Sequence, residues 1–113
     1  MWITYNLKDC QYSRLDSVVK KITPLAVFTA HEDGHRVCGH TDGYISEQQI
    51  LRREREAWKV AIRTLKANNE WDAEAEQCAV VCLSTYYMWF YPPVRAVKLA
   101  LRFIQRLSTA VQG

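Results

Sequence analysis

In the first half of the chain, apolar side chains recur at every second residue in several places, which is the period of a β-strand. Turn signals at Asp33-Gly34 and Asp42-Gly43 separate these segments, and Asp33-Gly34 is typical of a two-residue hairpin. One helix, from about Leu15 to Ile22, is predicted between the first two strands. The strands are predicted at residues 2–7, 25–30, 35–40 and 44–45. The first half is therefore predicted to form a small antiparallel β-α-β-β sheet unit.

After residue 45 the apolar spacing becomes helical. Ser46 and Gln49 form a capping box at the start of the first of three helices, and Pro92-Pro93 separates the second helix from the third. Asn69 is expected to cap the second helix, which contains an apolar stretch too short to span a bilayer and is expected to be the most buried of the three. The helices are predicted at residues 47–67, about 70–91 and 93–110.

Together these elements predict a single α+β domain over residues 1–113, with a sheet-containing half (1–45) and a helical half (46–113). A chain of 113 residues can bury one hydrophobic core without disulfides, and we expect its four cysteines to be free thiols. The core is predicted to include Trp58, Val81, Leu83, Trp89, Leu101 and Ile104.

Charge is distributed unevenly along this pattern. Residues 1–49 carry a net charge of −1, residues 50–66 carry +4, residues 67–93 carry −4 and residues 94–113 carry +4. On each of the two basic helices the cations fall within an arc about 80° wide, opposite an apolar face. These cations are the predicted partner-binding residues: Arg52, Arg55, Lys59, Arg63, Lys66, Arg95, Lys98, Arg102 and Arg106.

Several interpretations of these stripes remain open. Charged stripes are commonly only solvated surface, and the carboxylates between Glu70 and Glu76 could neutralise the stripes within the fold. The last helix, however, carries four cations and no acidic residue, which suits a phosphate backbone, a nucleoprotein complex or an acidic protein. Contact with a membrane surface is less favoured, because the apolar face of the last helix is needed for the core.

Residues 31–42 contain the highest concentration of side chains that could bind a metal or take part in catalysis. In the predicted hairpin His31, Cys38 and His40 share one face, so a zinc site formed by these three residues is the alternative hypothesis. Their spacing matches no standard zinc motif, and polar side chains on an exposed hairpin face explain them more simply. We therefore expect the protein to bind no metal or other cofactor, and binding of Zn²⁺ is the alternative to test.

Signatures of enzymes are not evident. The sequence has no glycine-rich phosphate loop and no nucleophile elbow, and we expect no helical His-Glu-x-x-His pair. The sequence therefore favours a protein that is not an enzyme.

With no secretory signal or bilayer-spanning stretch, the expectation is a cytoplasmic, non-catalytic interaction protein that uses its basic helices, of the kind found among phage or mobile-element accessory and inhibitor proteins. The competing hypothesis is a metal-dependent protein centred on the segment from His31 to His40. The sequence leaves the oligomeric state open.

Overall fold

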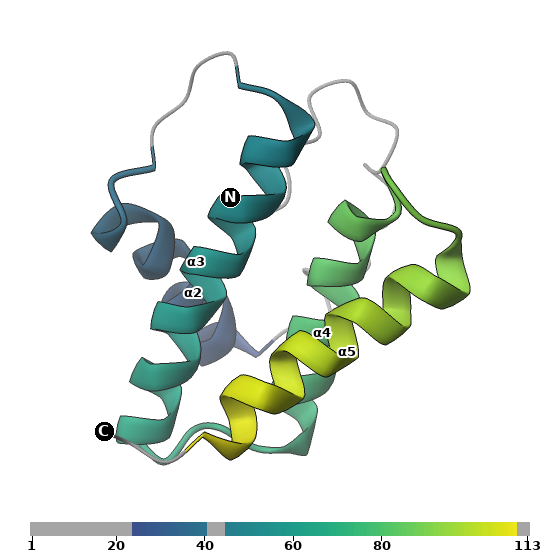
Figure 1. Cartoon of the computed structure of the whole chain (residues 1–113). Helices are drawn as coiled ribbons and strands as arrows, with labels where there is room; N and C mark the ends of the chain where they lie inside the picture. The colour runs from purple at the N-terminus through teal and green to yellow at the C-terminus, as the bar shows by residue number, and fades with distance from the viewer. Residues whose placement is uncertain (1–23, 41–44, 111–113) are drawn as a thin grey trace.

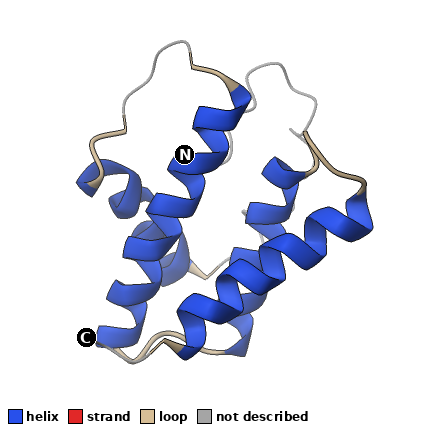
Figure 2. Cartoon of the chain, in the orientation of Figure 1, coloured by secondary structure: helices blue, strands red, loops and turns tan. Residues whose placement is uncertain are grey.

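A computed structural model describes residues 24–40 and 45–110, and every regular element in these two ranges is an α-helix (Figures 1 and 2). The α+β prediction is therefore wrong for the described part of the chain, which forms a compact helical bundle. The helices are α2 (Leu25–Val37), α3 (Glu47–Ala67), α4 (Ala73–Tyr87) and α5 (Pro93–Thr109).

The predicted hairpin is helix α2. Its buried residues are Val27, Ala30, His31, Gly34 and His35, which recur at the spacing of three and four residues that one face of a helix requires. The turn signal at Asp33-Gly34 lies inside this helix, because Gly34 packs against the backbone of α3 rather than supplying a turn. The predicted strand 2–7, the helix 15–22 and the turn at 42–43 lie outside the described residues. Residue 44 of the predicted strand 44–45 also lies outside them, and Ile45 is not in a strand.

Helix α3 has the predicted bounds, Glu47–Ala67. The side chain of Ser46 accepts a hydrogen bond from the backbone N–H of Gln49, and the Gln49 side chain accepts one from the backbone N–H of Ser46. At the other end Asn69 adopts a left-handed conformation, with φ of 59°. The prediction that Asn69 caps the next helix is wrong, because Asp72 Oδ1 accepts from the backbone N–H of Ala75, 2.8 Å away.

Helices α4 and α5 pack side by side, and α2 lies against α3 (Figure 1). Nine of the 15 residues of α4 are buried, the largest share of any described helix. Three predicted core residues are fully covered: Trp58, Leu83 and Ile104. Val81 and Leu101 are exposed and Trp89 is half-buried, because the buried face of each helix follows other positions at helical spacing. Cys38, Cys78 and Cys82 are free thiols.

None of the described helices combines the length and the apolar composition that crossing a bilayer requires.

Candidate metal centre

His31 and His35 lie one turn apart on the face of α2 that packs against α3. Both imidazoles are buried, His31 completely and His35 with 5% of its surface exposed. Residues four apart on a helix project in the same direction, so the two rings lie next to each other with centroids 4.8 Å apart. The helical period of α2 therefore brings together two nitrogen ligands that a hairpin would place on opposite faces.

Glu54 of α3 is fully buried and faces both rings. Its Oε1 lies 3.1 Å from Nε2 of His31, and its Oε2 lies 2.8 Å from Nε2 of His35. Ligand atoms of the three residues all lie within 4.8 Å of one another, a grouping that could hold a metal ion. Ligands of a tetrahedral zinc ion, each about 2.0–2.2 Å from the metal, are roughly 3.3–3.6 Å apart, so a small outward adjustment would admit the ion.

The surroundings of this group favour the ionisation states in which ligands bind metals. Burial lowers the pKa of His31, while the charges of Glu54 and Glu32 oppose that shift, and His31 stacks on the buried ring of Trp58 at a centroid distance of 4.1 Å. Burial opposes ionisation of Glu54, but the charges and hydrogen bonds of His31 and His35 outweigh it and lower the pKa of Glu54 to about 2. An ionised Glu54 is a ligand form that binds a cation, and the lowered pKa of His31 eases the loss of the proton that a metal would displace.

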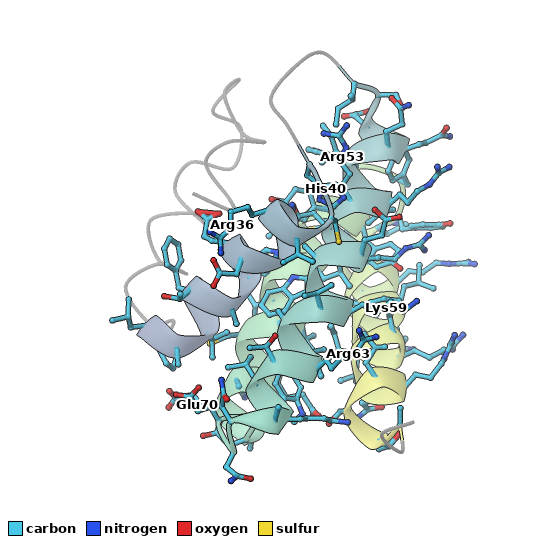
Figure 3. The ribbon with its side chains drawn as sticks, turned by 90° about the vertical axis from the view of Figure 1, so that its left-hand side faces the viewer. Arg36, His40, Arg53, Lys59, Arg63 and Glu70 are labelled. Carbon is cyan, nitrogen blue, oxygen red and sulfur yellow. The ribbon has the colours of Figure 1, made fainter. Side chains whose placement is uncertain are left out.

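His40 extends the group toward the surface. Its Nδ1 lies 2.9 Å from Nδ1 of His35, and its Nε2 lies 2.9 Å from Oε1 of Glu56 on α3. The side chain of His40 is 6% exposed and that of Glu56 is 50% exposed. Glu54, His35, His40 and Glu56 therefore form a row of polar contacts that runs from the core to the surface (Figure 3 labels His40 beside α3).

Gly34 sets the distance between α2 and α3 at this site. A Cβ at Gly34 would overlap the carbonyl oxygen of Ala57 and lie 3.1 Å from its carbonyl carbon and 3.2 Å from its Cα. These atoms belong to the backbone, so a side chain could be accommodated only if the helices separated. Glycine between His31 and His35 therefore lets α2 approach α3 closely enough for both imidazoles to reach Glu54.

Gly34→Ala is expected to destabilise the protein by about 1–3 kcal/mol despite the better helix propensity of alanine, because the helices must separate. It should also weaken metal binding, although no ligand is changed. Urea unfolding and zinc titration would measure the two effects. Asp33→Ala is the matched control on the same turn, where a half-exposed side chain can be shortened without approaching α3. Ala57→Gly should not restore stability, since the obstructing atoms are backbone; full rescue would contradict this explanation.

The predicted zinc ligands are only partly brought together. His31 belongs to the buried group, and His40 contacts His35 rather than Glu54. Cys38 is exposed at the end of α2 and lies outside the group. Burial and the nearby Glu56 raise the pKa of the Cys38 thiol, which disfavours the thiolate form that binds zinc.

Sequence reasoning did not identify His35 and Glu54 as candidate ligands. The expectation of no helical His-Glu-x-x-His pair is wrong, because residues 31–35 read His-Glu-Asp-Gly-His and are helical. The five-residue pattern was visible in the sequence, but the assignment of Asp33-Gly34 to a turn concealed it. Glu54 carried a weaker signal, as an acidic residue on the apolar side of a basic helix.

The predicted partner-binding cations show no ion pair with the acidic residues from Glu70 to Glu76 in the described ranges. Figure 3 places Glu70 at the lower end of the ribbon, apart from Lys59 and Arg63. Three of the cations have other contacts, and one of them, Arg95, lies over the ring of Tyr91. Lys66 donates to the carbonyl oxygens of Leu107 and Ala110, at the C-terminal end of α5, and Arg55 lies over the ring of Phe103 on α5.

Comparison of the chain with protein-family models, with curated proteins and with solved structures returned no match.

Proposed function

We propose that this protein binds Zn²⁺ through His31, His35 and Glu54 and uses it to hydrolyse an amide bond, as a metal-dependent peptidase does. The observation that carries the proposal is the buried contact of both oxygens of Glu54 with the Nε2 atoms of two histidines one helical turn apart. Two imidazoles and one carboxylate are a common protein ligand set of catalytic zinc, with a fourth position left for substrate or water. The alternative hypothesis from the sequence also placed Zn²⁺ in this segment, but on His31, Cys38 and His40 of a hairpin, and only His31 is common to the two ligand sets.

The pattern of hydrogen atoms can accommodate either a cation or an additional proton at this position. Three contacts join Glu54, His35, His40 and Glu56 in a row, and each requires one hydrogen between its two heavy atoms. Two neutral imidazoles carry only two such hydrogens, so the row without a metal needs one additional proton. A cation between His35 and Glu54 removes that requirement, because His35 then presents a bare Nε2 to the metal and two hydrogens satisfy the two remaining contacts.

Glu32 is the residue from which we infer hydrolysis. It follows His31 directly, is half-buried, and its charge acts on His31. On a helix, two histidines four residues apart with a glutamate after the first are the arrangement in which zinc peptidases use the glutamate as general base. Zinc, when bound, supplies Lewis-acid activation of the water and of the substrate carbonyl. Glu32 would take a proton from the attacking water and pass it to the leaving amine, so that one amide and one water become a carboxylic acid and an amine.

The same three ligand types also bind Fe²⁺, so the metal must be identified directly. Protein purified without a histidine tag would be analysed for bound metals and tested for cleavage of an unstructured substrate such as casein. We expect about one zinc ion per chain, with cleavage that a chelator stops and added zinc restores. A chain that takes up no zinc would refute the metal site. A zinc-loaded chain that cleaves neither casein nor a peptide library would refute the peptidase assignment and leave a structural site.

A second candidate function is binding of single-stranded nucleic acid by the cationic surface, which we define as Arg52, Arg55, Arg95, Lys98 and Arg102. The observation that favours it is that two of these cations, Arg55 and Arg95, lie over aromatic rings, and none of the five forms an ion pair within the described residues. Arg55 lies 5.9 Å from the centre of the Phe103 ring, and Arg95 lies 5.3 Å from that of Tyr91. Two grooves contain the five cations, and one is also lined by the buried Tyr87 and by the exposed Phe90 and Tyr91, on which bases could stack.

Reversal of charge at Arg95, Lys98 and Arg102 is expected to weaken binding of a single-stranded oligonucleotide at least tenfold. The slope of log affinity against log salt should fall by about 0.7 for each phosphate that the variant no longer neutralises. Fluorescence anisotropy at several salt concentrations would measure both quantities. The control is Arg36→Glu, which reverses an exposed cation that is paired with Asp33 and lies outside the surface. Binding of polyglutamate but not of the oligonucleotide would instead indicate an acidic protein partner.

A further inference from the structure

We propose that His40 and Glu56 position His35 for metal binding, with His40 accepting a hydrogen bond from the metal ligand and Glu56 accepting one from His40. The inference rests on the proposed zinc site and assigns a role to two residues that do not themselves touch the metal. It also explains why a histidine beyond the end of α2 is nearly as well covered as the ligands in the core.

The backbone at the end of α2 is built to return His40 to His35. The backbone N–H of Gly39 donates to the carbonyl oxygen of Arg36, and that of His40 donates to the carbonyl oxygen of His35, both at 3.0 Å. Gly39 has φ of +74°, the left-handed conformation that glycine adopts readily. This pair of bonds is the Schellman motif, which reverses the chain at a helix end. It places His40 five residues after His35 and in contact with it.

The contacts of His40 fix the direction of both hydrogen bonds once a metal is bound. A ligand nitrogen carries no hydrogen, so His35 with Nε2 on the metal must carry its hydrogen on Nδ1. That hydrogen can be donated only to a bare Nδ1 of His40, 2.9 Å away. His40 then carries its own hydrogen on Nε2 and donates it to Oε1 of Glu56, at 2.9 Å.

Such outer contacts orient the ring of a metal ligand and select its tautomer, and their loss commonly lowers metal affinity about 10- to 100-fold. A ring of similar size without nitrogen atoms would preserve packing but leave Nδ1 of His35 without its acceptor. An amide side chain at position 40 would retain an acceptor near the position of Nδ1. Glu56 contacts the other side of His40 and is half-exposed, so its replacement by glutamine should have a smaller effect.

The test is zinc affinity, measured by competition with a chelator, for the wild-type protein, His40→Phe, His40→Asn, Glu56→Gln and His31→Ala. We expect His40→Phe to bind zinc about 10- to 100-fold more weakly, His40→Asn to recover most of that loss, Glu56→Gln to lose only a few-fold, and His31→Ala to lose binding. Urea unfolding of the metal-free variants would show whether His40→Phe retains the fold; if it does not, the comparison of His40→Asn with wild type and the NMR measurement below still decide the question.

A direct readout comes from NMR of ¹⁵N-labelled, zinc-loaded protein. A hydrogen bond between two ring nitrogens transmits a scalar coupling, so His35 Nδ1 and His40 Nδ1 should show a coupling that is absent in His40→Phe. Wild-type protein that does not bind zinc would overturn both the metal site and the positioning role. Wild-type protein that binds zinc, with unchanged affinity in His40→Phe and no coupling, would overturn the positioning role alone.

Discussion

Glu54→Ala is expected to cost about 3–5 kcal/mol of folding free energy even without metal, because it removes one partner from a fully buried polar group. The carboxylate faces the Nε2 atoms of His31 and His35, and alanine would leave both imidazoles in the core without it. Domains of this size have roughly 5–15 kcal/mol of stability in total, so the loss would be a large part of it. Urea unfolding with a chelator present would measure the effect apart from metal binding.

The same variant should also lose its response to zinc. A ligand that binds only the folded state raises stability by RT ln(1 + [L]/Kd), so zinc should raise the unfolding midpoint of the wild type and not that of Glu54→Ala. Glu56→Ala is the matched control two residues further along α3. Its side chain is half-exposed and pairs with His40 rather than with the buried group, so in chelator we expect a loss of no more than about 1 kcal/mol. Equal midpoints for Glu54→Ala and wild type in chelator would contradict the account of this buried group.

The sequence predicted the helices of the second half much better than the fold of the first half. Capping residues and prolines act locally, so Ser46 with Gln49 and Pro92-Pro93 marked the helix ends close to where they occur. Asp33-Gly34 has the local preference of a turn, yet it is helical. The reason is tertiary: close contact of Gly34 with the backbone of Ala57 stabilises the helix, and that contact is not visible in a window of a few residues.

Only part of the candidate metal centre could be predicted from the sequence, for the same reason. A hairpin places His31 and His35 on different faces, whereas a helix places both on one face. Once residues 25–37 are taken as a helix, the His-Glu-x-x-His pattern is evident and the third ligand can be sought on the next helix. Glu54 is then the natural choice, because it shares the apolar side of α3 with Trp58, four residues later. The wrong assignment of a hairpin to this segment therefore led to the wrong set of metal ligands.

The exposed cationic stripes, unlike the metal site, could be predicted from the sequence, because charge and helical period suffice to predict an exposed stripe. Arg52, Lys59 and Arg63 are exposed on α3, as are all four cations of α5. Arg55 and Lys66 are the exceptions, because both are half-buried. Arg55 lies over the ring of Phe103, and the ammonium of Lys66 binds the carbonyl oxygens that α5 leaves unsatisfied at its end. Sequence alone could not show that one member of the stripe stabilises a helix end instead of facing a partner.

Glu32→Gln is expected to reduce the hydrolytic rate about 10²- to 10⁴-fold, the usual contribution of a general base, while zinc remains bound. The amide has nearly the volume of the carboxylate but cannot accept the proton of the attacking water. Because Glu32 is not one of the three residues of the buried group, zinc content and the unfolding midpoint should stay close to those of the wild type. The measurements are bound metal, unfolding in urea and the rate of peptide cleavage on one preparation.

Separation of these three readouts distinguishes a catalytic glutamate from a structural one. Asp33→Asn is the matched control, since it removes the next carboxylate along α2, one that pairs with Arg36 at the surface. It should leave cleavage unchanged. A Glu32→Gln protein that keeps both zinc and full cleavage would remove Glu32 from the mechanism. A Glu32→Gln protein that loses zinc together with activity would instead make Glu32 part of the metal site, and the general base would have to be sought elsewhere.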